Sequence, residues 1–371
     1  MSTSSYKTDA LEAKKKLEQI SPTMCLAKWN QTSLHLPTGL TNSCYHPPLH
    51  EMDAEAVKLN PATLHNTAEK LNQRQQMLQG EQPEGCSYCW NMEKTGEMSD
   101  RHYRSGEPWA MQDFEDIRKN PIDEHWTPRY VEVNFNNACN LKCSYCSPQF
   151  STTWSKEVDR YGQYPTSPPH NAPEHFQGRR KPIPNREDNP YVTAFWKWWP
   201  TLYKNLKHFR MTGGEPMMDV NTYKVFQYII DHPKKDLHLN VTSNMCPADK
   251  KIKDKYFNMA QEICMQEKVE HMMQFVSVDA YGKKAEYIRN GLDFNYMMDN
   301  VEEFLERIPV SNSITFICTY NNLSITSMDK LLEKILEVQQ DVSEGVVRCA
   351  TAETTRMATD NTATRVVPEH T

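Results

Sequence analysis

Short apolar runs alternate with amphipathic stretches in the part of the chain that begins at Tyr130. The short runs are β-branched or aromatic and each ends in a polar loop, which predicts strands at Tyr130–Phe135, His208–Met211, Leu237–Thr242, Gln274–Asp279 and Ser313–Thr319, with a sixth near Val346–Ala350. The stretches between them predict helices at Ala194–Lys207, Thr222–Ile230, Asp249–Gln266, Asn295–Arg307 and Ser327–Gln339. Strands that alternate with helices predict an α/β fold built on a parallel sheet or a barrel.

The rest of the chain does not follow this alternation. Residues 1–20 are polar, which predicts disorder or a frayed helix, and residues 21–100 predict a small domain with a helical stretch between Asp53 and Leu78. Prolines among charged residues predict a linker over 101–128. We therefore expect the α/β part over 129–350, with the proline-rich segment 151–193 as a long loop and 351–371 as an unstructured tail.

Composition narrows the class of protein. The 371 residues carry a net charge of −6 without a basic block, which argues against a nucleic-acid surface. No apolar run reaches the ~18 residues that a membrane span needs, and the first residues lack the apolar stretch of a signal peptide. Eleven cysteines in such a chain are better explained as metal ligands and ordinary thiols than as disulfides, so we expect a cytoplasmic protein.

Three cysteines in a CxxxCxxC pattern directly follow the first predicted strand: Cys139, Cys143 and Cys146. Cys thiolates hold iron–sulfur clusters, and three ligands would leave one iron of a four-iron cluster open to another molecule. The alternatives are a zinc site or unrelated thiols, although zinc favours CxxC pairs and four protein ligands. The end of a first strand is also where α/β barrels place their active sites. The loop therefore favours an iron–sulfur cluster.

This loop, with the aromatic Tyr145 before its last cysteine, resembles that of the radical SAM superfamily, and the resemblance covers about residues 130–340. It implies a partial (βα)5–6 barrel of the TIM type and an open iron that binds S-adenosylmethionine, with Tyr145 against the adenine. Thr212-Gly-Gly-Glu-Pro216 resembles the family's GGEP segment, which binds the methionyl amino group. The implied cofactor contacts are Gly213, Gly214, Glu215 and Pro216, Ser243 and Asn244 at the ribose, Ser277 and Asp279 in an S-x-D element, and Arg289 at the methionyl carboxylate.

A second set of cysteines precedes the expected barrel: Cys25, Cys44, Cys86 and Cys89. Their spacing, with Gly39 between the first two, resembles the CX9–15GX4C and CxxC pattern of SPASM and twitch domains, and four cysteines suit twitch better. The resemblance implies an auxiliary 4Fe–4S cluster, and zinc is the alternative because two cysteine pairs also suit a tetrahedral ion. Such domains normally follow the barrel. The order here resembles that of twitch-containing radical SAM proteins carried by bacteriophages.

The two resemblances together imply an enzyme. A reduced 4Fe–4S cluster would cleave S-adenosylmethionine to a 5′-deoxyadenosyl radical, which abstracts hydrogen from a substrate. A peptide or protein side chain is our first interpretation of that substrate, with flavodoxin or ferredoxin as electron donor. A carbohydrate or nucleotide-linked small molecule is the alternative substrate. A non-catalytic iron–sulfur, zinc-binding or electron-transfer protein with the same fold is the alternative function. The sequence assigns no catalytic residue beyond the cluster ligands.

Overall fold

The chain divides into two compact units. We describe them from a computed structural model, which describes residues 3–165, 180–309, 311–341, 346–353 and 364–365. Unit 1 comprises Met1–Val133 with Glu187–His208, and unit 2 comprises Asn134–Arg186 with Phe209–Thr371.

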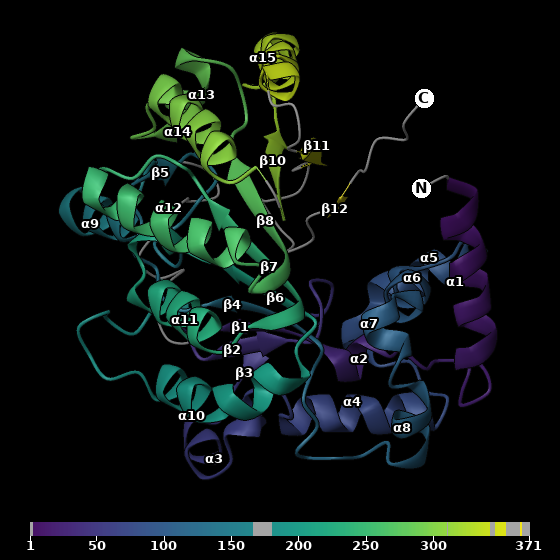
Figure 1. Cartoon of the computed structure of the whole chain (residues 1–371). Coiled ribbons are helices and arrows are strands. Elements are labelled where there is room, and N and C mark those ends of the chain that lie inside the picture. The colour runs from purple at the N-terminus through teal and green to yellow at the C-terminus, as the bar shows by residue number, and fades with distance from the viewer. Residues whose placement is uncertain (1–2, 166–179, 310, 342–345, 354–363, 366–371) are drawn as a thin grey trace. The chain divides into compact units, whose positions relative to one another are not determined.

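The sheet of unit 2 is mostly parallel (Figure 1). Its hydrogen-bonded order is β12 (Thr364–Arg365), β11 (Val346–Glu353), β10 (Asn312–Tyr320), β8 (Val269–Ser277), β7 (Lys234–Ser243) and β6 (His208–Thr212). The pairs β7–β8, β8–β10 and β10–β11 are parallel, and β12 is antiparallel to β11. Ser243 stands opposite Val276, and Ser277 stands opposite Ile317, so these strands reach the same edge of the sheet at their carboxyl ends. The prediction of a mostly parallel α/β sheet is confirmed.

Amphipathic helices connect the strands of unit 2. They are α9 (Thr152–Tyr161), α11 (Val220–Asp231), α12 (Lys250–Met265), α13 (Lys283–Ile288), α14 (Phe294–Arg307) and α15 (Met328–Asp341), with the 3-10 turns η5 (Pro216–Met218) and η6 (Ile325–Ser327). Asp219, Asp249 and Asp293 cap α11, α12 and α14, because each carboxylate accepts a backbone N–H of the first turn. A separate antiparallel pair joins β5 (Lys142–Cys143) to β9 (Arg289–Asn290).

Unit 1 combines short strands with many helices. The hydrogen-bonded order of its strands is β4 (Tyr130–Asn134), β1 (Gln31–His35), β2 (Leu40–Asn42) and β3 (His50–Glu51), of which β1–β2 and β2–β3 are antiparallel. Its helices are α1 (Thr3–Leu17), α2 (Ala27–Asn30), α3 (Ala54–Leu59), α4 (Ala68–Leu78), α5 (Ser87–Lys94), α6 (Asp100–Gly106), α7 (Pro108–Met111), α8 (Phe114–Lys119) and α10 (Pro190–Asn205), with the turns η1 (Pro61–Leu64) and η2 (Glu84–Cys86). A core cluster that includes Trp29, Met77, Trp90 and Trp109 packs α1, α2, α4, α5, α7 and α8 together.

The structure differs from the predicted segments outside the sheet. Residues 101–128, predicted as a linker, contain α7 and α8, because Trp109, Ala110, Phe114 and Ile117 give that stretch an apolar face that packs into the core of unit 1. Residues 1–20 were predicted to be disordered or a frayed helix. The helix α1 forms there, and it buries Ala10, Ala13 and Leu17.

Helices replace both ends of the long loop that was expected over 151–193. It contains α9, whose Trp154 and Val158 are buried one turn apart, and α10 already begins at Pro190. Residues 166–179 lie outside the described residues, as does most of the tail expected over 351–371. Of that tail, residues 351–353 belong to β11 and Thr364–Arg365 form β12.

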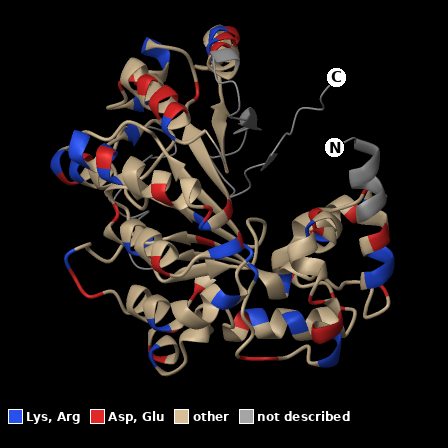
Figure 2. Cartoon of the chain, viewed as in Figure 1, with Lys and Arg blue, Asp and Glu red and all other residues tan. Residues whose placement is uncertain are grey.

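Acidic and basic residues are interspersed along the helices of both units (Figure 2). Among the described residues, no helix has the length and apolar character needed to cross a membrane.

Candidate functional site

A pocket of about 140 Å³ in unit 2 collects residues from segments that are far apart in the sequence. They come from the loop after β4, from the carboxyl ends of β6, β7 and β8, and from β9. The predicted site residues that line it are Cys139, Cys143, Tyr145, Cys146, Gly213, Gly214, Glu215, Ser243, Asn244, Ser277 and Arg289. Leu141, Phe150 and Thr242 also line it and were not predicted. Pro216 and Asp279 were predicted, but they are not among the lining residues.

Hydrogen bonds fix the cysteine loop to neighbouring elements. Cys143 lies in β5, opposite Arg289 of β9. At the start of α9, the Thr153 hydroxyl donates to the carbonyl of Cys139 at 2.6 Å, and the Trp154 indole donates to the carbonyl of Cys143 at 2.9 Å. The loop backbone is therefore held from two sides, and its thiols remain directed at the pocket.

The two glycines after β6 let the chain pass close to the cysteine loop. A Cβ on Gly214 would lie 2.2 Å from the carbonyl oxygen of Ala138, and a Cβ on Gly213 would lie 2.1 Å from Oδ1 of Asn134. Gly213 also has φ +115°, which an L side chain rarely adopts. The next residue, Glu215, donates its backbone N–H to the same Ala138 carbonyl at 2.6 Å. Close backbone packing thus requires glycine at these positions, independently of any ligand.

The carboxylate of Glu215 is buried and joins the ends of β6 and β7. Its Oε1 accepts hydrogen bonds from the Ser243 hydroxyl at 2.7 Å and from the backbone N–H of Met217 at 3.0 Å, and its Oε2 accepts one from the backbone N–H of Asn244 at 2.8 Å. Burial raises the pKa of Glu215, and these three hydrogen bonds act against that rise. Ser243 and Asn244 are therefore already bonded to Glu215.

Asp279 lies behind the pocket wall and is fully buried. Its Oδ2 accepts a hydrogen bond from the Tyr145 hydroxyl at 2.8 Å, and its Oδ1 accepts one from Nη2 of Arg289 at 3.0 Å and one from the backbone N–H of Thr319 at 2.7 Å. Nε of Arg289 also lies 2.7 Å from Oδ2, at an angle that makes an ion pair but no hydrogen bond. Burial lowers the pKa of Arg289, but the charges of Asp279, Tyr145 and Cys143, together with the hydrogen bond to Asp279, outweigh burial and hold that pKa well above its usual value.

Arg289 also reaches toward the cysteine loop. Its Nη1 lies 3.7 Å from Sγ of Cys143, and its guanidinium lies 5.5 Å from the centre of the Tyr145 ring. Burial raises the pKa of the Cys143 thiol, and the Arg289 charge acts in the opposite direction. Burial likewise raises the pKa of Cys139 and Cys146, each to about 12. The bare thiols are thus protonated near neutral pH, and a metal would have to displace their protons to bind.

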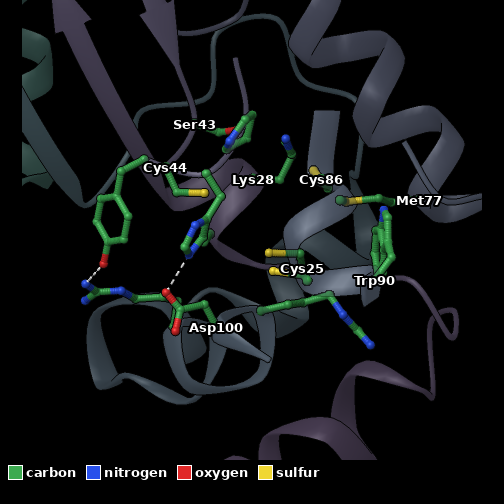
Figure 3. A pocket seen from close by; sticks show the side chains of 15 residues that line it. Cys25, Lys28, Ser43, Cys44, Met77, Cys86, Trp90 and Asp100 are labelled. Carbon is green, nitrogen blue, oxygen red and sulfur yellow. Dashed lines mark hydrogen bonds and ion pairs between the residues drawn. The ribbon is translucent and has the colours of Figure 1, made fainter. Parts of the chain in front are cut away.

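The four cysteines of the second set line one pocket in unit 1 (Figure 3). Cys25 precedes α2, Cys44 follows β2, Cys86 ends η2 and Cys89 lies in α5. Burial raises the pKa of Cys44 to about 12, and it also raises the pKa of Cys25 and of Cys89. The remaining lining residues are Ala27, Lys28, Ser43, Tyr45, His46, Pro47, Met77, Trp90, Asp100, Arg101 and Arg104.

The ten cysteines from Cys25 to Cys318, whose side chains the structure describes, are free, so none of them forms a disulfide. Within the described part of the chain, no group of three or more His, Cys, Asp or Glu side chains is arranged to hold a metal ion.

Sequence reasoning missed the polar and charged residues that support both sites. Lys28, Asp100 and Arg101 line the unit 1 pocket, but only Lys28 lies near a cysteine in the sequence. Thr242 lines the unit 2 pocket one position before the predicted Ser243. The alternation of apolar and polar residues along β7 was the signal that could have drawn attention to this position.

No protein-family model matches the chain, and no curated protein matches it. Among solved structures, SuiB of Streptococcus suis bound to S-adenosylmethionine is 14% identical with a TM-score of 0.41, and the match covers 86% of this chain and 61% of that one. A second SuiB structure is 14% identical with a TM-score of 0.39, and the match covers 86% of this chain and 60% of that one. SuiB bound to the precursor peptide SuiA is 13% identical with a TM-score of 0.40, and the match covers 83% of this chain and 58% of that one. The chain therefore spans about three fifths of the length of these SuiB chains.

Proposed function

We propose that the chain is a radical SAM enzyme whose unit 2 pocket holds a 4Fe–4S cluster and S-adenosylmethionine. One observation carries this proposal: three thiols spaced CxxxCxxC line the same pocket as the loops after β6, β7 and β8. The donor set fits the group, because iron–sulfur clusters take Cys thiolates and three of them leave a position for a further ligand. When bound and reduced, such a cluster supplies the electron that splits S-adenosylmethionine into methionine and a 5′-deoxyadenosyl radical.

The residues of the chain would bind the cluster and S-adenosylmethionine, orient them and shield them from water. Cys139, Cys143 and Cys146 would ligate the cluster. The backbone at Gly213 and Gly214, which lines the pocket, would face the methionyl amino group. Ser277 would bind the cofactor from the end of β8. Ser243 and Asn244 would contact the ribose while Glu215 fixes their positions.

Arg289 and Tyr145 would act at the other side of the same pocket. Arg289 would bind the methionyl carboxylate through donors that Asp279 does not occupy, since a guanidinium has five N–H groups. Tyr145 would lie against the adenine with its hydroxyl held by Asp279.

We further propose that the four cysteines of unit 1 hold a second metal centre in a twitch-like domain, with an auxiliary 4Fe–4S cluster preferred over zinc. Four thiols around one pocket support this proposal. The proposed substrate is a peptide or protein side chain and the proposed electron donor is a flavodoxin or ferredoxin. Both of these follow from the family resemblance alone.

The test is anaerobic reconstitution with iron, sulfide, a reductant and S-adenosylmethionine. We expect the wild-type chain to form 5′-deoxyadenosine and methionine in equal amounts, and we expect Cys143→Ala to abolish both products because one cluster ligand is lost. Cys264→Ala is the matched control, since Cys264 is a fully buried thiol of α12 that does not line the pocket. A wild-type protein that binds iron and sulfide but forms no 5′-deoxyadenosine would favour the non-catalytic alternative.

A further inference from the structure

Two lysines are buried in the interior of unit 1. Lys28 in α2 is 2% exposed and Lys70 in α4 is fully buried. An ammonium group removed from water is strongly destabilising unless an opposite charge lies close to it. Lysine is therefore rarely buried in this way without a partner of opposite charge.

The hydrogen-bond partners of these two lysines are neutral. Nζ of Lys28 donates to Oε1 of Gln73 at 2.7 Å, and Nζ of Lys70 donates to the hydroxyls of Thr32 and Thr41 at 2.8 and 2.9 Å. The side-chain amide of Gln73 donates a hydrogen bond to the Glu69 carboxylate, but that carboxylate is exposed to solvent. Across the described residues, neither lysine forms an ion pair with a carboxylate.

The other charged residues that line the four-cysteine pocket already have partners. Arg101 pairs with Glu93 at 2.7 Å, and Arg104 lies 3.6 Å from Glu107. Asp100 accepts from His46 at 2.7 Å. Among the described residues that line this pocket, Lys28 is thus the basic residue whose charge no carboxylate balances.

Lys28 lines the same pocket as the thiols of Cys25, Cys44, Cys86 and Cys89, which become negatively charged once they are ionised. Lys70 does not line the pocket, but its Nζ donates to the hydroxyl of Thr41 in β2, the strand that Cys44 follows. Negative charge at the cysteines and positive charge at the lysines therefore stabilise one another.

We propose that Lys28 and Lys70 are the built-in counter-charges of an anionic metal–thiolate centre held by Cys25, Cys44, Cys86 and Cys89. The inference rests on the metal centre proposed for unit 1 and not on cleavage of S-adenosylmethionine. Four thiolates around a zinc ion or a 4Fe–4S cluster leave a net negative charge inside a poorly solvated pocket. Buried ammonium groups beside that charge offset its burial, and the centre in turn offsets the burial of the lysines. The two lysines are positioning residues, because they act on the metal through its ligands.

The experiment compares Lys28→Met with wild type in the full chain, in both the metal-loaded and the metal-free, reduced forms. We expect roughly 10- to 100-fold faster loss of the unit 1 metal to a chelator, which is the size of effect that groups supporting metal ligands usually have. The loaded variant should unfold at a lower temperature than loaded wild type. The metal-free variant should unfold at the same or a higher temperature than metal-free wild type, because an unbalanced buried charge has been removed.

This opposite response of the two forms separates electrostatic balance from simple packing. A lysine kept only for its hydrogen bond to Gln73 would, when replaced, lower the unfolding temperature of both forms equally, and that result would overturn the inference. Lys28→Arg should retain the metal as wild type does, and Lys70→Met should repeat the pattern of Lys28→Met if the latter does not fold. Lys58→Met is the matched control, because Lys58 of α3 is exposed and paired with Glu55. This substitution should change neither the rate of metal loss nor the unfolding temperature of either form.

Metal content decides which proposal has failed. The unit 1 metal is the iron or zinc that wild type holds in excess of a Cys86→Ala/Cys89→Ala variant. If that difference is zero, the metal centre itself is absent and both the centre and its counter-charges are rejected. If the difference is present and Lys28→Met retains the metal as firmly as wild type, the counter-charge inference alone is rejected.

Discussion

At the scale of single residues, Asp279 is the group on which the unit 2 pocket depends most. It does not line the pocket itself, yet it holds the lining residue Tyr145 through one oxygen and the lining residue Arg289 through both. Two residues with different proposed roles toward one cofactor therefore share a single buried anchor. An S-x-D pattern in the sequence predicts that Asp279 matters, but its role as a holder of other side chains becomes visible only in three dimensions.

We predict that Asp279→Asn lowers the free energy of unfolding by about 3 kcal/mol, since removal of one partner leaves the Arg289 charge buried and unpaired. Tyr145→Phe is the comparison, and it should lower the same quantity by only about 1.5 kcal/mol, because it removes one hydrogen bond to the Asp279 carboxylate and leaves the charge pair intact. Chemical denaturation of the metal-free protein measures both effects without dependence on a cluster. Equal losses in the two variants would show that the Asp279–Arg289 charge pair does not stabilise the fold.

Glu215 illustrates a second limit of sequence reasoning at this scale. The pattern Thr212-Gly-Gly-Glu-Pro216 correctly drew attention to the segment, and its glycines do lie where the chain passes close to another loop. The carboxylate, however, faces Ser243 and Asn244 and is nearly inaccessible to solvent. Nothing in the order of residues shows that the two motifs bind each other, since that contact depends on β6 and β7 being neighbours in the sheet.

At the scale of elements, the buried cap of α11 makes the stability of the fold depend on pH. Asp219 caps α11 through Asn221, and burial raises its pKa from 3.8 to about 6, while the Asn221 hydrogen bonds and the Lys224 charge oppose the rise. The folded protein thus binds this proton more tightly than the unfolded chain does. The contribution of Asp219 to stability is complete below the unfolded pKa of about 4 and is lost as the pH rises through about 6.

We predict that Asp219→Asn removes this pH dependence, because an amide keeps the capping acceptor without a charge. Relative to wild type, the variant should gain roughly 3 kcal/mol in unfolding free energy between pH 4 and pH 7, from about 1.4 kcal/mol per pKa unit. Urea denaturation at several pH values measures this difference. Asp249→Asn, which changes the exposed cap of α12, is the matched control because water still solvates that carboxylate. The same slope in both variants would contradict the effect of burial.

The elements themselves were largely predictable where the apolar pattern was regular. The helix predicted over Asn295–Arg307 is α14, Phe294–Arg307, and the strand predicted over Ser313–Thr319 is β10, Asn312–Tyr320. The start of β8 was missed by five residues, since polar Glu270 and His271 interrupt its apolar alternation at the more exposed end. The helices α7 and α8 were missed because prolines and charged residues concealed four core residues in a segment that resembles a linker.

At the scale of the whole molecule, each candidate site is complete within its own unit. Every residue that lines the four-cysteine pocket belongs to unit 1, and every residue that lines the three-cysteine pocket belongs to unit 2. This follows from the sequence only in part. The cysteine spacing separates the two sets, but the assignment of residues 187–208 to unit 1 interrupts the strand–helix alternation and was not predicted.

Because neither pocket borrows a side chain from the other unit, we predict that the two centres load independently. Cys86→Ala/Cys89→Ala should lose the unit 1 metal and keep the unit 2 iron, and Cys139→Ala/Cys143→Ala/Cys146→Ala should do the reverse. Iron, sulfide and zinc counts measure this, with circular dichroism as the check on folding. If both centres are iron–sulfur clusters, each variant should lose about half of the iron. Zinc in unit 1 would leave the iron of the first variant unchanged. Loss of both metals in either folded variant would contradict independence, because it would require one centre to form before the other pocket can bind.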